Sequence, residues 1–236
     1  MTITSRLELP LLQPAQAQKH VTVNEALVRL DALAMLVLEA REALSPPVMA
    51  GEGQAWALAA APSGDWAGQG GRIAIRQGGG WVFAVPRRGW RAWVVEEGAT
   101  AVFDGTAWRG GALALSPGGA GSFVRIKEFD HAVTAGGTSL TDGTIPEDVL
   151  VLAVGARVTA PLTGTLSSWR LGVDGATDRF GAGLGVATGS FARGLLGTPL
   201  ANYTPTPLLL TAEGGSFAGG HLRIAVHYYE PGVPGL

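Results

Sequence analysis

The chain has 236 residues, no cysteine and a formal net charge of −2. Hydrophobic residues make up 47% and charged residues 15%, a balance typical of chains with packed cores rather than disordered ones. The lack of cysteine excludes a disulfide framework and a zinc site with cysteine ligands. The near-zero charge argues against a nucleic-acid binder, which needs a basic face. No apolar run of 18 residues and no secretory signal pattern is present, so we expect cytoplasmic synthesis and no membrane insertion.

The first predicted region, residues 1–47, is an extended arm followed by a helix. Pro10 and Pro14 disfavour helix in the arm. The apolar spacing predicts a helix over 23–44, with Thr22 as the N-cap and Ser45-Pro46-Pro47 as the stop. We expect these residues to oligomerise the chain and attach it to another protein.

The predicted helix carries a heptad-like seam of apolar residues. These residues are separated by 4, 3, 4 and 3 positions, as in a coiled coil: Val23, Leu27, Leu30, Ala34 and Val37. A second apolar stripe predicts burial on more than one side of the helix, which parallel copies from other subunits would supply. We therefore expect a homo-oligomer, in particular a trimer. The alternative is one helix packed against its own β domain.

The rest of the chain predicts short strands separated by glycine-containing turns, and hence a mainly β protein with one N-terminal helix. Six of the seven tryptophans lie between residues 56 and 108, and the segment 116–121 resembles a linker. We therefore predict a small Trp-rich β module over 48–120 and a jelly-roll-like β-sandwich over 121–236. The ten strands we expect are 55–59, 72–76, 81–85, 91–95, 101–103, 123–133, 149–158, 168–173, 207–211 and 221–229.

A search for catalytic motifs finds none. The glycines at 181, 183 and 185 do not have the spacing G-x-G-x-x-G of a dinucleotide-binding loop, because the third glycine of that pattern is missing. No P-loop, zinc-protease motif or nucleophile elbow is present. His221 and His227 lie too far apart on one strand to share a metal ion. The sequence therefore predicts a protein that is not an enzyme and that uses no cofactor and no metal.

One cluster has the composition of a sugar-binding site. Carboxylates and guanidinium groups can hydrogen-bond hydroxyls, and an aromatic ring can stack on a pyranose face. The candidate glycan-binding residues are Trp169, Arg170, Asp174, Asp178 and Arg179. The alternative is ordinary turn chemistry at Asp174-Gly175, with Trp169 in the core.

Several segments resemble a known protein family. The motif QAQKHVTVNEAL at residues 16–27, followed by LDAL at 30–33, is similar to the opening signature of a domain of unknown function in alphaproteobacterial prophages and gene transfer agents. Further resemblance lies in the segments 80–89, 168–173, 178–181, 210–212 and 217–220. Proteins of this kind occur as tail fibres and head spikes, and the resemblance is greatest to those of Rhodobacter-type gene transfer agents.

The resemblance implies a component of the particle surface that displays a binding domain outward and adheres to cell-surface polysaccharide, as a trimer. It supplies no catalytic residues. Two alternatives stay open: a structural adaptor that links the particle to another virion protein through residues 1–45 without binding glycan, and a capsule depolymerase. The chain shows no elongated repeat that would line a polysaccharide groove, which counts against the depolymerase.

Overall fold

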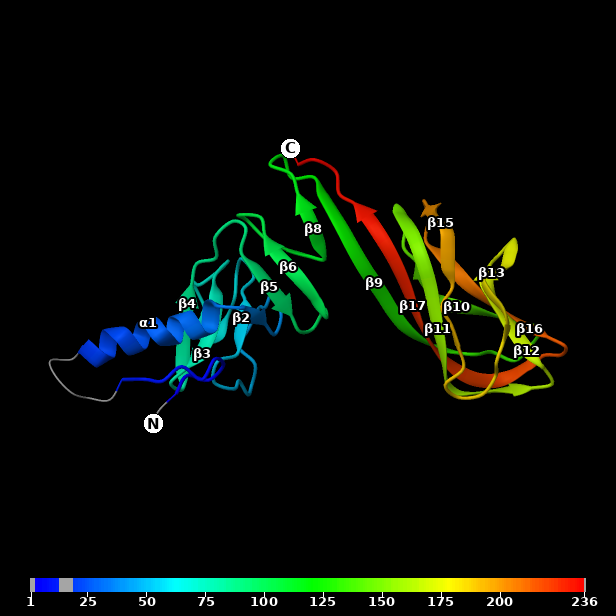
Figure 1. The fold of residues 1–236 in the computed structure, drawn as a ribbon, viewed down its shortest axis with the longest axis horizontal. Helices are drawn as coiled ribbons and strands as arrows, with labels where there is room; N and C mark the ends of the chain where they lie inside the picture. The colour runs from blue at the N-terminus through cyan, green and yellow to red at the C-terminus, as the bar shows by residue number, and fades with distance from the viewer. Residues whose placement is uncertain (1–2, 13–18, 236) are drawn as a thin grey trace. The chain divides into compact units, whose positions relative to one another are not determined.

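The computed structural model describes residues 3–12 and 19–235 and divides into two compact units, Met1–Ala112 and Leu113–Leu236 (Figure 1). The protein is mainly β with an N-terminal helix, as predicted. The predicted boundary between residues 47 and 48 is not a unit boundary, because residues on both sides of it share one core in the N-terminal unit.

The N-terminal unit consists of a helix, a short 3-10 turn and two small sheets. The sheets have the strand orders β1-β5-β6-β7 and β2-β3-β4. The elements are α1 (Lys19–Leu33), β1 (Val37–Leu38), β2 (Ala55–Ala57), η1 (Gly64–Trp66), β3 (Ile73–Gln77), β4 (Gly80–Ala84), β5 (Arg91–Val94), β6 (Ala99–Phe103) and β7 (Trp108–Gly110).

The helix α1 ends eleven residues before the predicted position and begins four residues earlier, so Thr22 lies inside it rather than at its N-cap. Its last turn is closed by the Ala34 amide, which donates to the Leu30 carbonyl at 2.8 Å. Met35 then adopts a φ of 49°, a left-handed conformation that breaks the helical path. The chain continues as β1, which pairs in parallel with β5.

This early end corrects the predicted seam. Ala34 lies beyond the helix, and Val37 is in β1 opposite Trp93. Val23 and Leu30 keep helical positions and are 41% and 54% exposed, with Leu27 partly buried between them. The apolar stripe on α1 is therefore shorter than predicted, and it faces away from the core of its own unit.

A buried carboxylate ties the N-terminal arm to α1. Asp31 is 2% exposed and accepts hydrogen bonds from the Thr4 hydroxyl and the Leu7 amide, both at 2.6 Å, and from the Arg6 amide at 3.1 Å. The Arg6 guanidinium donates to the carbonyls of Ala32 and Met35 at the C-terminal end of the helix. These described residues of the arm are thus held against the helix.

The tryptophans of this unit mostly pack in its cores. Trp56, Trp66 and Trp81 contact one another, with ring centroids 5.0–5.9 Å apart. Trp108 packs on Phe103 at 5.3 Å. Trp93, at 47% exposure, is the one large aromatic side chain of this unit among the exposed hydrophobic residues that the structure describes.

The C-terminal unit is an antiparallel sandwich. Its sheets have the orders β10-β16-β12-β13 and β14-β11-β17-β9-β8, and β15 also pairs with β11. The strands are β8 (Ala112–Leu115), β9 (Gly121–Ala132), β10 (Thr138–Ile145), β11 (Val149–Gly164), β12 (Ser168–Val173), β13 (Ala176–Leu184), β14 (Phe191–Ala192), β15 (Leu195–Asn202), β16 (Thr206–Glu213) and β17 (Phe217–Pro231).

The segment predicted to be a linker is a turn of this unit. The Ser116 amide donates to the Ala120 carbonyl at 2.8 Å, and the Ala120 amide donates to the Ser116 hydroxyl at 3.0 Å. These bonds close the connection between the neighbouring strands β8 and β9. The glycines there allow a tight reversal of the chain. A turn of this kind has the same composition as a linker.

Both sheets contribute to the sandwich core, and β17 shows how the sequence alternates between core and surface. Leu222, Ile224 and Val226 are fully buried and face the second sheet. The residues that alternate with them, Arg223, Ala225 and His227, therefore project from the outer face, because successive strand residues point to opposite sides.

Candidate functional site

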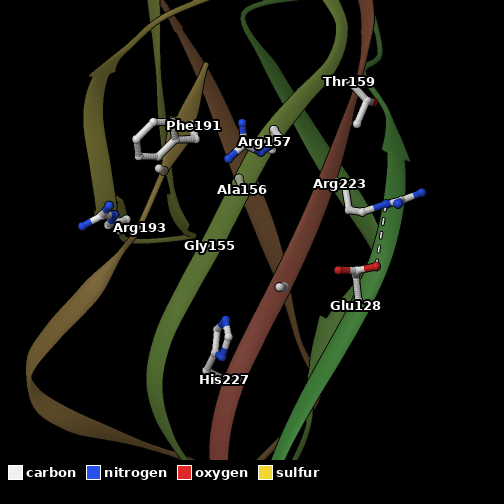
Figure 2. A pocket seen from close by; sticks show the side chains of 11 residues that line it. Glu128, Gly155, Ala156, Arg157, Thr159, Phe191, Arg193, Arg223 and His227 are labelled. Carbon is white, nitrogen blue, oxygen red and sulfur yellow. Dashed lines mark ion pairs between the residues drawn. The ribbon is translucent and has the colours of Figure 1, made fainter. Parts of the chain in front are cut away.

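The outer face of the larger sheet of the sandwich contains a hollow of about 460 Å³ (Figure 2). Its walls come from β9, β11, β17 and the segment around β14, so residues far apart in sequence meet there. The lining residues are Glu128, Gly155, Ala156, Arg157, Thr159, Phe191, Ala192, Arg193, Arg223, Ala225 and His227. We call this feature the outer-face hollow.

Strand register explains why the sheet is hollowed at this place. Gly155 on β11 lies opposite Ala225 on β17. These two outward positions have at most a methyl group, so they form a floor without a covering side chain. On one side the next pair is Arg157 opposite Arg223, and on the other Ala153 lies opposite His227. Longer side chains thus flank a floor of small ones.

The row of long side chains continues across four strands. Phe191 on β14 lies opposite Arg157, Arg157 lies opposite Arg223, and Arg223 lies opposite Asp130 on β9. Directly opposite side chains in an antiparallel sheet have Cβ atoms only about 4.5–5.5 Å apart. The two neighbouring guanidinium groups turn to different partners: Arg223 toward β9 and Arg157 toward Phe191.

An exposed aromatic ring lies between two guanidinium groups at the β14 side. Phe191 is 52% exposed, and the central carbons of Arg157 and Arg193 lie 5.4 and 5.8 Å from its ring centroid. The Arg157 guanidinium also donates to the Gly189 carbonyl at 3.1 Å. Figure 2 shows Phe191 and Arg193 on the segment beside β11.

At the opposite wall the charge of Arg223 is balanced by acidic residues. Its guanidinium donates to both carboxylate oxygens of Asp130, at 2.8 and 2.9 Å, and lies 3.8 Å from Glu128. The hydrogen bond from Arg223 lowers the pKa of Asp130, and the same bond raises the pKa of Arg223. Both groups therefore stay charged at neutral pH.

The hollow combines the groups that bind a hydroxyl-rich ligand. Guanidinium groups donate hydrogen bonds, the Glu128 carboxylate accepts them, and the Phe191 face offers an apolar stacking surface. Within residues 3–12 and 19–235, no three acidic or histidine side chains are placed to hold a metal ion. No helix in that described part is long and apolar enough to cross a membrane.

The structure separates the glycan site predicted from sequence into unlike parts. Trp169 is fully buried in the sandwich core, and its indole N–H donates to the Gly185 carbonyl at 2.9 Å. Its ring has no face open to a sugar, so its predicted role in stacking is wrong and the alternative that placed it in the core is confirmed.

The other four predicted residues are nearer the surface. Arg170 is tied to Glu213, which also accepts hydrogen bonds from Ser168 and the Gly183 amide. The Ser168 bond and then the Arg170 bond lower the pKa of Glu213. Exposed residues nearby are Asp174, Asp178 and Arg179 on the β12–β13 hairpin. They border none of the hollow's lining, and the prediction that they bind glycan stays a prediction.

Sequence reasoning missed the residues of the outer-face hollow. Phe191 and Arg193 lie in a segment where no strand was predicted, and Arg157 and Arg223 were treated only as parts of predicted strands. The one signal in the sequence for this site was an arginine at an outward-facing position in each of two long predicted strands. The pairing of β11 with β17 and β14 was not readable from a single sequence.

Comparison with known proteins gives one family match and one structural similarity of note. Residues 23–109 match the family model "Protein of unknown function (DUF2793)", which is less than half of the chain. This range contains the Asn24-Glu25-Ala26-Leu27 part of the N-terminal motif. No curated protein matches the chain.

Among solved structures, the chain is similar to one described as the Cyanophage Pam1 capsid asymmetric unit. The two chains are 23% identical, with a TM-score of 0.37. The similarity covers 50% of this chain and 93% of the phage chain. At this identity and score it assigns neither a fold nor a role to the present protein.

Proposed function

We propose that this protein is a surface spike or fibre component of a phage or gene transfer agent, in particular a head spike of the Rhodobacter type, and that it binds cell-surface polysaccharide. It acts by binding and not by catalysis, and the outer-face hollow is the binding site. The observation that carries this proposal is the exposed Phe191 ring between two guanidinium groups, beside a floor that lacks covering side chains.

Three features support polysaccharide as the ligand. The hollow is open to solvent, so a chain of sugar rings can lie in it without threading an end. A half-exposed phenyl ring offers a flat apolar surface of the kind that packs on a pyranose face. Charged donors lie beside that ring, a carboxylate acceptor lies at the opposite wall, and both can pair with sugar hydroxyls.

The link to a virion rests on the N-terminal unit. The sequence motif of residues 16–33 resembles prophage and gene-transfer-agent proteins, and the matched family model covers most of this unit. We propose that residues 1–45 attach the chain to another virion protein and that copies of α1 bundle through Val23, Leu27 and Leu30. Three copies on one spike would raise the avidity of an individually weak sugar site.

The test fills the hollow without adding charge. Ala225→Leu puts a branched side chain on the floor, while Ala132→Leu makes the same change at an exposed position of β9 outside the hollow. We expect Ala225→Leu to lower the binding of labelled full-length protein to bacterial cells by about tenfold, or 1.4 kcal/mol, and Ala132→Leu to leave it unchanged. Equal binding by Ala225→Leu and the wild type would exclude the hollow as the polysaccharide-binding site.

A further inference from the structure

We propose that the polysaccharide bound in the outer-face hollow is acidic, and that Arg157 and Arg193 pair with its anionic substituents, carboxylate or phosphate groups. This inference rests on the proposed function and narrows its ligand class. Its basis is the unequal distribution of charge between the two walls of the hollow.

The wall at β9 and β17 is already balanced. Arg223 pairs with Asp130 through two hydrogen bonds and lies near Glu128. An incoming anion there would meet two carboxylates and would have to compete with Asp130 for the same guanidinium hydrogens. This wall is therefore suited to neutral hydroxyl groups.

The wall at β14 is not balanced. Within residues 3–12 and 19–235, neither Arg157 nor Arg193 forms an ion pair. Arg157 uses part of its donor capacity on the Gly189 carbonyl, and the structure gives Arg193 no hydrogen bond among those residues. A guanidinium has five N–H donors in a fixed fork that matches the oxygens of a carboxylate or phosphate.

Both cations flank one exposed aromatic ring. Both guanidinium groups lie against the same phenyl ring, 5.4 and 5.8 Å from its centroid. The ring and the Gly189 carbonyl restrict Arg157 before any ligand arrives, which reduces the ordering cost of binding. Two like charges held near one ring repel each other, and an anion beside either of them relieves that repulsion.

The alternative is that the two arginines serve only to cover Phe191 and to keep the protein soluble, and that the ligand is neutral. A neutral polymer would gain hydrogen bonds from the guanidinium groups but no charge pairing. The two readings differ in one measurable respect: only an acidic ligand loses affinity when its own charge is removed chemically.

The experiment uses surface polysaccharide extracted from a bacterium to which the full-length protein adheres. One portion stays native, a second has its carboxyl groups reduced to alcohols, and a third has its phosphates removed with hydrofluoric acid. We expect either the second or the third to bind at least about tenfold more weakly than the native polymer, which identifies the anionic group. Binding of both treated polymers within about twofold of the native one would overturn the proposal.

Variants locate the anion on the protein. We expect Arg157→Ala and Arg193→Ala each to weaken binding of the native polymer by about tenfold, and Arg157→Lys to recover part of the loss, since it keeps the charge without the fork. Arg87→Ala is the matched control, because Arg87 is an exposed arginine outside the hollow. Unchanged binding by both Arg157→Ala and Arg193→Ala would place the anion elsewhere and overturn the assignment.

The failure of this inference is distinguishable from the failure of the proposed function. Undiminished binding to the neutralised polymers would overturn the acidic ligand and leave polysaccharide binding in place. A protein that adheres to no polysaccharide-bearing cell would overturn both. We expect near-identical circular dichroism melting curves for all variants, because the substituted arginines are exposed.

Discussion

Asp31 illustrates how one residue can fix the position of a whole segment. Its carboxylate is nearly inaccessible to water and is satisfied by three donors from residues 4–7. A buried carboxylate is tolerated only when such donors surround it. The arm and the helix are therefore mutually dependent: without Asp31 the donors of the arm have no buried partner.

We predict that Asp31→Ala lowers the free energy of unfolding of the N-terminal unit by about 1–3 kcal/mol, because three donors lose their acceptor. Urea unfolding followed by tryptophan fluorescence measures this, since six of the seven tryptophans lie in that unit. Glu25→Ala, an exposed acidic position on the same helix, is the control. Equal unfolding midpoints for Asp31→Ala and wild type would contradict the assigned role.

Trp169 and Phe191 show which residue roles the sequence could reveal. Both are aromatic residues near arginines, and only burial separates them: Trp169 is 0% exposed and Phe191 is 52% exposed. Trp169 alternates with other apolar residues on a predicted strand, a pattern that agrees with a core position. Phe191 follows a glycine and a serine, and nothing local indicates that it faces solvent beside Arg157.

At the scale of elements, the strand predictions were better than the helix prediction. Each of the ten predicted strand ranges overlaps a strand of the structure, because alternation and glycine turns are local signals. The helix was predicted too long because Leu36 and Val37 continue the apolar spacing of α1. The same spacing also suits a strand, and the backbone conformation of Met35 decides between the two.

The shortened seam on α1 leads to a prediction about assembly. Leu30 is 54% exposed in the single chain, so Leu30→Asp leaves the fold of the unit intact. In a bundle the same change buries a carboxylate without a partner, which costs several kcal/mol. The mass in solution measured by light scattering should therefore fall from a multiple of 24.2 kDa for the wild type to 24.2 kDa for Leu30→Asp.

The control for this prediction is Arg29→Asp, which adds the same side chain at an exposed position beside the seam. We expect it to keep the oligomer. A wild-type mass of 24.2 kDa would exclude bundling altogether, and an oligomer that survives Leu30→Asp would move the interface away from α1.

The site itself depends on pairing between distant strands. Gly155 and Ala225 form the floor of the hollow because β11 and β17 pair in that register, although 69 intervening residues separate the two positions. The bulges in this ladder shift the register several times. A single sequence does not specify such shifts, so neither the floor nor the row from Phe191 to Asp130 could be predicted.

On the scale of the whole molecule, the two units carry different parts of the proposed function. Each has its own hydrophobic core, and the family match lies within the N-terminal unit while the hollow lies within the C-terminal one. Under the proposed function, attachment and bundling fall to the N-terminal unit and ligand binding to the C-terminal one. This division agrees with a protein that holds a sugar-binding domain out from a particle.

The most direct test of the central proposal is amide chemical-shift mapping on the full-length protein during titration with oligosaccharides from the surface polysaccharide. We expect the largest shifts at residues 155–157, 191–193 and 223–227, which line the outer-face hollow. Shifts concentrated at residues 170–179, the site first predicted from sequence, or no shifts in the C-terminal unit, would contradict it.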